Sequence, residues 1–323
     1  MLKNYMRQSS IQPLTSDFVL GYFCQFYVKI TKKMKNCPYC DMPVYLYFRT
    51  ASKHHYRCLT CDLICSDLQK SYNETVATYS EHYFERLSTD QLEGQRDRLY
   101  SHILELIARN TGNLGGGRLL DIGTGCGFFL VAAQKGKWEG KGVEPSIQSV
   151  AVARRQNNLD VFHGTLEEFD EDGQFDAITL INVLDHSALP WIELNRANKL
   201  LRPGGLLYLR FPNGFLHSRL FRMAQRYDLS KSLSKFLVFH TYSFTPRYIR
   251  KLLYDHGFDQ INLFNSPPSL GDPHKIFPSP ILATYFKRII YFIAKSVERI
   301  SRGRSFIGTS LEVTAVKTKN SQN

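Results

Sequence analysis

The stretch that decides the fold is LLDIGTGCGFFL, residues 119–130 of this 323-residue chain. A short apolar run leads into the loop Asp121-Ile122-Gly123-Thr124-Gly125-Cys126-Gly127, and an apolar, helix-like stretch follows. Glycines let a backbone turn tightly and approach a ligand, and a helix N-terminus offers unpaired N–H groups. The stretch therefore predicts a strand, a ligand-binding loop and a helix. By itself the loop is ambiguous, because a dinucleotide-binding G-x-G-x-x-G differs by one residue.

Apolar runs and helix-like stretches alternate from this loop onward. The strand-like runs are residues 118–122, 138–143, 161–162, 175–182 and 206–211. Helices are predicted for residues 128–135, 147–156 and 191–201, with Ser146 as an N-cap, and a further helix starts at the pair Thr245-Pro246. This alternation predicts an α/β fold with a parallel, doubly wound sheet.

Glu144 follows the second predicted strand, 23 residues after Asp121. Ligands bind at the carboxyl ends of strands in doubly wound sheets, where both acidic residues would lie. A carboxylate there can accept hydrogen bonds from both ribose hydroxyls of an adenosine. The alternative is that Glu144 is a solvated turn residue.

Four segments resemble, in order, the landmarks of class I S-adenosylmethionine (SAM)-dependent methyltransferases: LLDIGTGCGFFL, GVEPS, FDAITLINVLDH and LRPGGLLYLRFPN. The resemblance covers about residues 80–317 and is strongest to the branch of ubiquinone-pathway O-methyltransferases and natural-product or sugar methyltransferases. It implies a Rossmann-like, mixed seven-stranded sheet and methyl transfer from SAM. A nicotinamide enzyme would need a glycine triad offset by one residue and would leave the turn Pro203-Gly204-Gly205 unexplained.

The resemblance also assigns cofactor contacts. It implies that the methionine part of SAM is held by the loop residues Asp121, Gly123, Thr124, Gly125 and Gly127, and the ribose by Glu144. Gly164-Thr165-Leu166 would lie beside the adenine, and Asn182 and Val183 under the sulfonium. Many relatives carry an acidic residue near Gly164-Thr165, so the chain departs from the pattern at the adenine contact.

Two C-x-x-C pairs predict a metal site. The four cysteines are Cys37, Cys40, Cys58 and Cys61, with 17 residues between the pairs. Closed zinc sites with four cysteine ligands have roughly 15 to 20 residues there. A zinc ribbon with structural Zn²⁺ is predicted, stabilised by the metal because so short a segment buries little core. A redox C-x-x-C is the alternative, and Cys65 could substitute for Cys61.

The composition limits the class of partner without choosing one. The formal net charge is +12, and 43% of the residues are apolar. A basic chain favours an anionic partner: nucleic acid, an acidic membrane surface or a negatively charged substrate. Paired cysteines without a convincing signal peptide favour the reducing cytoplasm.

Residues 281–302 form a predicted basic amphipathic helix. Its apolar stripe comprises Leu282, Phe286, Ile289, Ile293, Val297 and Ile300, and most of its lysines and arginines lie off that stripe. One interpretation is a helix that covers the sheet. The other is a helix that binds an anionic membrane surface, peripherally at the inner face, which would suit a lipid-linked acceptor.

Methyl transfer from a sulfonium needs alignment, and it needs a base only if the acceptor is a hydroxyl or an acidic carbon. His186 follows the fourth predicted strand and is the first candidate base, and His240 is the second. The alternative for each is a structural or capping histidine.

The expected organisation is an N-terminal extension (1–33), a zinc ribbon (34–70), a helical linker and cap (71–117), and the methyltransferase domain (118–319). The extension is not part of the native protein if Met34 is the true start. The expected acceptor is a small molecule, a lipid or a glycan. Two alternatives stay open: an RNA methyltransferase whose ribbon reads RNA, and a non-catalytic binding protein with a retained SAM fold.

Overall fold

The computed structural model describes residues 35–67, 96–113, 116–171, 173–269 and 279–318. The predicted N-terminal extension and residues 71–95 of the predicted linker lie outside the described residues. Across the described ranges, no helix has the length and apolar character needed to cross a bilayer.

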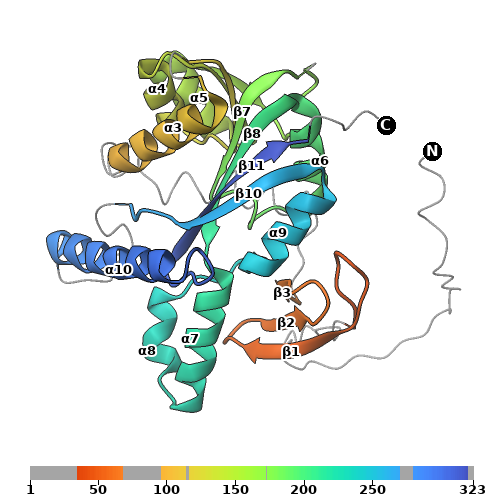
Figure 1. Ribbon diagram of the computed structural model, residues 1–323, viewed down its shortest axis with the longest axis vertical. Helices are drawn as coiled ribbons and strands as arrows, with labels where there is room; N and C mark the ends of the chain where they lie inside the picture. The colour runs from red at the N-terminus through yellow and green to blue at the C-terminus, as the bar shows by residue number, and fades with distance from the viewer. Residues whose placement is uncertain (1–34, 68–95, 114–115, 172, 270–278, 319–323) are drawn as a thin grey trace, which may run out of the picture. The chain divides into compact units, whose positions relative to one another are not determined.

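Seven strands form the central sheet, in the order β10-β11-β8-β7-β4-β5-β6 (Figure 1). They are β4 (Arg118–Ile122), β5 (Glu139–Glu144), β6 (Asp160–His163), β7 (Phe175–Ile181), β8 (Leu201–Pro212), β10 (Phe258–Asn265) and β11 (Ser310–Lys317). Strands β4 to β8 are parallel, whereas β11 runs antiparallel to both β8 and β10. The predicted α/β fold with a doubly wound, mixed seven-stranded sheet is confirmed.

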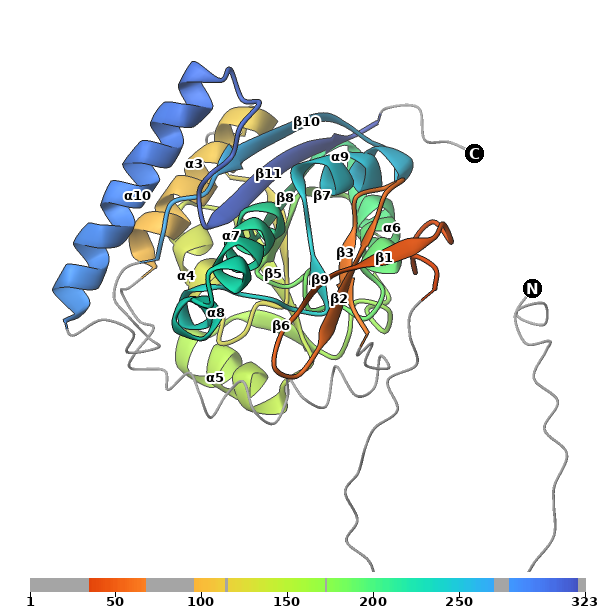
Figure 2. The same ribbon diagram turned by 90° about the horizontal axis from the view of Figure 1, so that it is seen from below.

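Helices cover both faces of this sheet. Helices α3 (Asp97–Thr111), α4 (Phe128–Lys135) and α5 (Ile147–Asn157) lie on one face, and α6 (Pro190–Leu200) and α9 (Pro246–Asp255) lie on the other (Figure 2). The Ser146 hydroxyl accepts from the Ser149 N–H at the start of α5, and the Thr245 hydroxyl accepts from the Tyr248 N–H at the start of α9. Both predicted N-caps are confirmed, and each satisfies an otherwise unpaired helix N–H.

The remaining helices lie in the chain after β8 and after β10. Helix α7 (Gly214–Arg226), the short α8 (Ser230–Leu233) and the 3-10 turn η1 (Ser234–Phe236) precede the segment that contains His240. Helix α10 (Pro280–Ile300) lies between β10 and β11 in the chain.

The structure corrects the predicted Pro203-Gly204-Gly205 turn before the strand at 206–211. Strand β8 already begins at Leu201, because Leu201 pairs with Phe175 before the main register resumes with Leu206 opposite Ala177. Residues 202–205 therefore form a bulge between two paired parts of β8, and Gly204 takes a positive φ of 75° there. A bulge absorbs extra residues without ending the strand pairing, and sequence periodicity does not distinguish this from a turn.

A second sheet joins the ribbon to the larger domain. Its order is β1-β2-β3-β9, with β1 (Val44–Arg49), β2 (His54–Cys58) and β3 (Ile64–Ser66) from the ribbon. The fourth strand, β9 (Tyr242–Ser243), comes from the chain just before α9 and pairs antiparallel with β3. Ribbon side chains such as Leu63 and Tyr56 share one continuous hydrophobic core with the sheet and with α9. The ribbon therefore packs directly against the larger domain, through a shared sheet and a shared core.

Candidate active site at the carboxyl edge of the sheet

The strand order reverses between β4 and β7, and Asp121 lies at that point. Its carboxylate accepts a hydrogen bond of 2.6 Å from the hydroxyl of Thr179, the residue opposite it on β7. Asp121 is 3% exposed, and burial raises its pKa to about 7. Doubly wound sheets bind their ligands at this kind of position.

Glu144 ends β5 and is fixed by two backbone groups. One carboxylate oxygen accepts from the Gly125 N–H at 2.8 Å, and the other accepts from the Ser146 N–H at 2.9 Å. Burial raises the pKa of this carboxyl, while the two backbone hydrogen bonds oppose the rise. Each oxygen keeps a further lone pair, so the carboxylate can still accept from a ligand hydroxyl.

The glycine loop leaves open space at Gly125, where we expect a ligand to contact the protein backbone. Gly125 has a φ of +58°, and a Cβ built on it would meet no heavy atom within 4 Å. The positive φ favours a glycine here, and the open space in front of it would let a ligand approach the backbone closely. Gly123 differs, because a Cβ there would lie 2.5 Å from the Val183 side chain. The loop and Glu144 together fit the methionine and ribose parts of SAM.

The other predicted loop and sulfonium-end residues lie around the same edge. The N–H of Thr124 donates to the Val143 carbonyl, and Gly127 is the N-cap of α4 with a φ of 81°. Asn182 follows β7 with a φ of 58°, and its side-chain oxygen accepts from the buried guanidinium of Arg210 at 2.7 Å. This bond fixes the orientation of the Asn182 amide.

The predicted adenine segment follows β6. The Gly164 N–H donates to the backbone carbonyl of Glu144 at 3.0 Å, and the Thr165 N–H and hydroxyl both donate to the carboxylate of Glu168. Leu166 is buried in the core. An acidic side chain is therefore present at this segment, but it lies at 168 and is engaged with Thr165.

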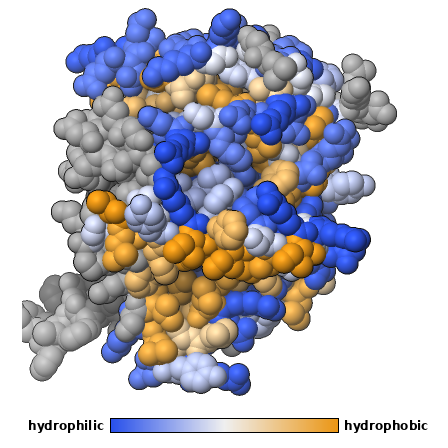
Figure 3. All heavy atoms as spheres, turned by 60° about the vertical axis from the view of Figure 1, so that its left-hand side comes forward, coloured by the Kyte–Doolittle hydropathy of each residue, from blue (hydrophilic) through white to orange (hydrophobic). Residues whose placement is uncertain are grey.

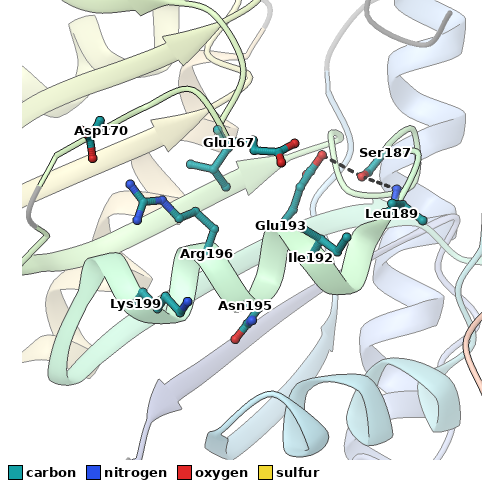
Figure 4. A pocket seen from close by; sticks show the side chains of 10 residues that line it. Glu167, Asp170, Ser187, Leu189, Ile192, Glu193, Asn195, Arg196 and Lys199 are labelled. Carbon is teal, nitrogen blue, oxygen red and sulfur yellow. Dashed lines mark hydrogen bonds between the residues drawn. The ribbon is translucent and has the colours of Figure 1, made fainter. Parts of the chain in front are cut away.

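A cavity of about 510 Å³ opens between this segment and α6 (Figure 4). Leu166, Glu167 and Asp170 line one side, and residues of α6 line the other. Glu193 accepts from the Ser187 hydroxyl at 2.7 Å, and burial raises the pKa of Glu193 to about 7. The lining does not include Asp121, Glu144 or either candidate base, so this cavity borders the predicted cofactor edge without containing it.

Asp185, His186 and His240 form a cluster after β7. The His240 Nε2 lies 3.5 Å from an Asp185 carboxylate oxygen, and the His186 Nε2 lies 3.8 Å from the same oxygen. The two imidazole centroids are 3.7 Å apart. The structure thus brings together the two histidines that the sequence singled out, although 54 positions separate them in the chain. The three side chains could also act as ligands of one metal ion, since their ligand atoms all lie within 4.8 Å of one another.

Burial makes all three groups of the cluster favour their uncharged forms. It lowers the pKa of His186 to about 2 and that of His240 to about 4, and it raises the pKa of Asp185 to about 7. The positive charge of Lys53, in the turn between β1 and β2, lowers the pKa of both rings further. Both imidazoles are therefore neutral near pH 7, the form that a general base requires, and their lowered pKa makes each a weaker base than a free imidazole.

The ribbon contacts the chain on both sides of His240. The ring of Phe239 packs at 4.9 Å from that of Phe48 and at 5.4 Å from that of His55. On the other side, Tyr242 pairs with Cys65 in the β3–β9 ladder, and its hydroxyl donates to the Ala188 carbonyl. The position of His240 is thus tied to the fold of the ribbon.

The four predicted metal ligands converge within the ribbon. The Cys37 and Cys61 sulfurs are 3.6 Å apart, as are those of Cys40 and Cys58, and all four lie within 4.8 Å of one another. Thiolates bound tetrahedrally to zinc at about 2.3 Å are about 3.8 Å apart, so the arrangement suits that ion. Cys65 is buried beside the group but outside it.

Comparison with known proteins identifies the family. Residues 92–263 match the model of a methyltransferase domain, which is more than half of the chain. The chain belongs to this family. The mixed seven-stranded sheet agrees with the fold that the sequence predicted from its resemblance to class I SAM-dependent methyltransferases.

The relatives of this chain include proteins named ubiquinone biosynthesis O-methyltransferase. That of Aromatoleum aromaticum is 31% identical over 125 residues, which cover 36% of this chain and 53% of that protein. That of Aliivibrio fischeri is 24% identical over 157 residues, covering 46% and 67%. The chain thus spans about half the length of the first curated relatives it matches.

Among solved structures, the 1,6-didemethyltoxoflavin N1-methyltransferase of Burkholderia thailandensis superimposes with a TM-score of 0.51 and 13% identity. The match covers 84% of this chain and 99% of that one, and it shows a shared fold.

Two residues of the candidate site were not predicted. Asp185 stands directly before His186, and an acidic residue beside a candidate base after a strand is a signal that could have identified it. Arg210 lies inside the apolar run of β8, where a buried cation needs partners; it bonds Asn182, the Ser266 hydroxyl and the Pro267 carbonyl. Those partners are distant in sequence, so only the fold reveals them.

Proposed function

We propose that SAM binds across the carboxyl edge of β4, β5 and β7, held by the residues that the sequence singled out. In this arrangement Asp121 and the loop through Gly127 bind the methionine part, and Glu144 binds the ribose hydroxyls. The adenine lies beside residues 164–166, and the sulfonium lies near Asn182 and Val183. The fixed Glu144 carboxylate beside the open Gly125 position supports this assignment most strongly.

We propose that the cluster after β7 removes a proton from the acceptor, with His240 as the base. A neutral imidazole can accept a hydroxyl proton as the methyl group is transferred. The imidazolium that forms then lies beside Asp185, and its positive charge would favour the ionised form of that carboxyl. His240 is favoured over His186 because it lies closer to Asp185 and because its pKa is lowered less. The observation that carries this proposal is the contact of both histidines with one buried carboxylate.

We propose a small-molecule acceptor of amphiphilic or lipid-linked character. The names of the curated relatives support this class. Three of the four basic ribbon residues that would favour RNA, Lys53 being the fourth, are engaged within the protein: His54 pairs with Asp67, Arg57 pairs with Asp62, and His55 is fully buried against Phe48. Large apolar side chains of α10 are exposed, among them Ile281, Phe292 and Ile300, and this supports an acceptor that is delivered from a membrane surface.

We propose that Zn²⁺ occupies the four-cysteine site. A shell of four thiolates leaves no position for substrate, so the metal would stabilise the ribbon. The hydrogen bond between the Cys37 and Cys61 thiols lowers the pKa of Cys37 and raises that of Cys61. Bound zinc would hold all four cysteines as thiolates. Because the ribbon contacts Phe239 and Tyr242, the zinc would act on the reaction through the position of His240.

Transfer of labelled methyl groups tests the proposed function. The full chain is incubated with methyl-labelled SAM and, separately, with the lipid fraction, the polar small-molecule fraction and the RNA of its producing cells. Label entering the lipid or small-molecule fraction, and lost with His240→Gln, is expected. Label entering RNA alone would show that the acceptor class is wrong, and label transferred equally by the variant would show that His240 is not the base.

A further inference from the structure

Large apolar side chains cover the outward face of α10. The side chains concerned are 47% to 84% exposed: Ile281, Leu282, Tyr285, Phe286, Ile289, Phe292, Ile293 and Ile300. They follow the helical repeat, and Figure 3 shows the resulting apolar band along the surface. The prediction of a helix whose apolar stripe covers the sheet is therefore wrong for this face, because the stripe points to solvent.

Small and polar side chains attach the inward face of α10 to β10. Ala283 and Ala294 are fully buried, and the Glu298 carboxylate accepts from the backbone and side-chain N–H groups of Asn265 at 2.7 and 2.8 Å. The Asn265 amide also donates to the Ala294 carbonyl. The helix is thus held by specific polar contacts, while its apolar surface is left on the outside. This is the reverse of the pattern in a helix that packs on a core.

The charges around the apolar face of α10 have one sign. Glu298 is the only acidic residue between Pro280 and Ile300, and it is 8% exposed and paired with Lys295. Arg288 and Arg299 are exposed on the helix, and Arg302 and Arg304 are exposed just after it. A partner that covers this face must therefore accept both apolar side chains and arginines.

The attachment point of α10 lies at the edge of the sheet that carries the active site. Strand β10 runs parallel to β8, since both are antiparallel to β11, so its last residue, Asn265, lies at the carboxyl edge. The next residue, Ser266, accepts from Arg210, which in turn holds Asn182. A surface that contacts α10 would therefore lie toward the edge where the acceptor must arrive.

We propose that the outward face of α10 docks in the interface of a membrane that contains anionic lipids. The apolar stripe enters the boundary between headgroups and acyl chains, and the arginines pair with lipid phosphates. A second copy of the chain fits less well, because it would bring arginines of like charge together at the interface. Docking would bring the active site to a lipid-linked acceptor, so its purpose rests on the proposed function. The docking itself can be measured without any methyl transfer.

Vesicle flotation of the full chain tests this proposal. The probes are vesicles of phosphatidylcholine alone and vesicles of phosphatidylcholine and phosphatidylglycerol in equal parts. The wild type should float with the anionic vesicles, and less so as salt is raised. Ile289→Ser with Phe292→Ser should lower binding about tenfold for each side chain, and Arg288→Gln with Arg299→Gln about fivefold for each arginine.

Tyr254→Ser is the matched control, because this ring on α9 is 74% exposed, about as much as Phe292. It should bind vesicles like the wild type. Absence of wild-type binding, or equal binding by the Ile289/Phe292 variant, would overturn the proposal. A wild-type dimer in sedimentation that dissociates in this variant, without vesicle binding, would overturn it in favour of a second copy. Titration of the wild type and of every variant with SAM separates the two proposals. A wild type that does not bind SAM would overturn the methyl-transfer assignment and leave the docking result intact.

Discussion

Replacing Asp185 with asparagine should stabilise the methyltransferase, and increasingly so as the pH rises. Burial raises the pKa of this carboxyl from 3.8 to about 7. Between those values the folded protein binds a proton that the unfolded chain has released, so the free energy of unfolding falls with rising pH. At about 1.36 kcal/mol for each pH unit between the two pKa values, the loss from pH 5 is about 2 kcal/mol at pH 7 and about 3 kcal/mol above the folded pKa, where it is complete.

The asparagine side chain of the Asp185→Asn variant does not titrate, so the variant lacks this loss. Urea unfolding followed by circular dichroism, without SAM, gives the free energy of unfolding of both proteins at pH 5 and pH 8. The difference between them should shift by about 3 kcal/mol in favour of Asp185→Asn across this range. A constant difference would show that burial does not destabilise the charged form. A shift in the opposite direction would show that the carboxylate is stabilised by a protonated histidine, and would refute the assigned protonation states.

The remaining predictions concern turnover, zinc and the cofactor loop. His240→Gln should lower turnover by about 10²- to 10⁴-fold with unchanged SAM affinity, and His186→Gln by less, as measured with methyl-labelled SAM; equal effects would remove the preference for His240. Elemental analysis should find one zinc per chain, and Cys58→Ser should remove both the metal and turnover but keep SAM binding; full activity without metal would contradict this. Gly125→Val should cost about 1–2 kcal/mol of stability from its positive φ and should abolish SAM binding measured by calorimetry; retained affinity would show that the ligand does not approach this backbone.

The α/β alternation could be predicted from the sequence because each strand and helix carries its own local signal. The apolar run that became β7 and the caps at Ser146 and Thr245 depend on neighbouring residues alone. The four cysteines were found for the same reason, since metal-ligand spacing is local within each pair.

Features that depend on distant pairing could not be predicted. Strand β9 has two residues and forms only because β3 lies beside it, so no periodicity marks it. The repeat in residues 281–302 predicts an apolar stripe, but the direction of the stripe depends on Asn265 and its bond to Glu298. Asp185 gains its role from a residue 55 positions away, His240.

Calorimetric titration of the full wild-type chain with SAM, and in parallel with NAD, tests the central claim most directly. The loop from Asp121 to Gly127 and the Glu144 carboxylate predict saturable binding of one SAM molecule per chain and no heat with NAD. Binding of NAD in preference to SAM, or no binding of SAM by the folded protein, would contradict the account.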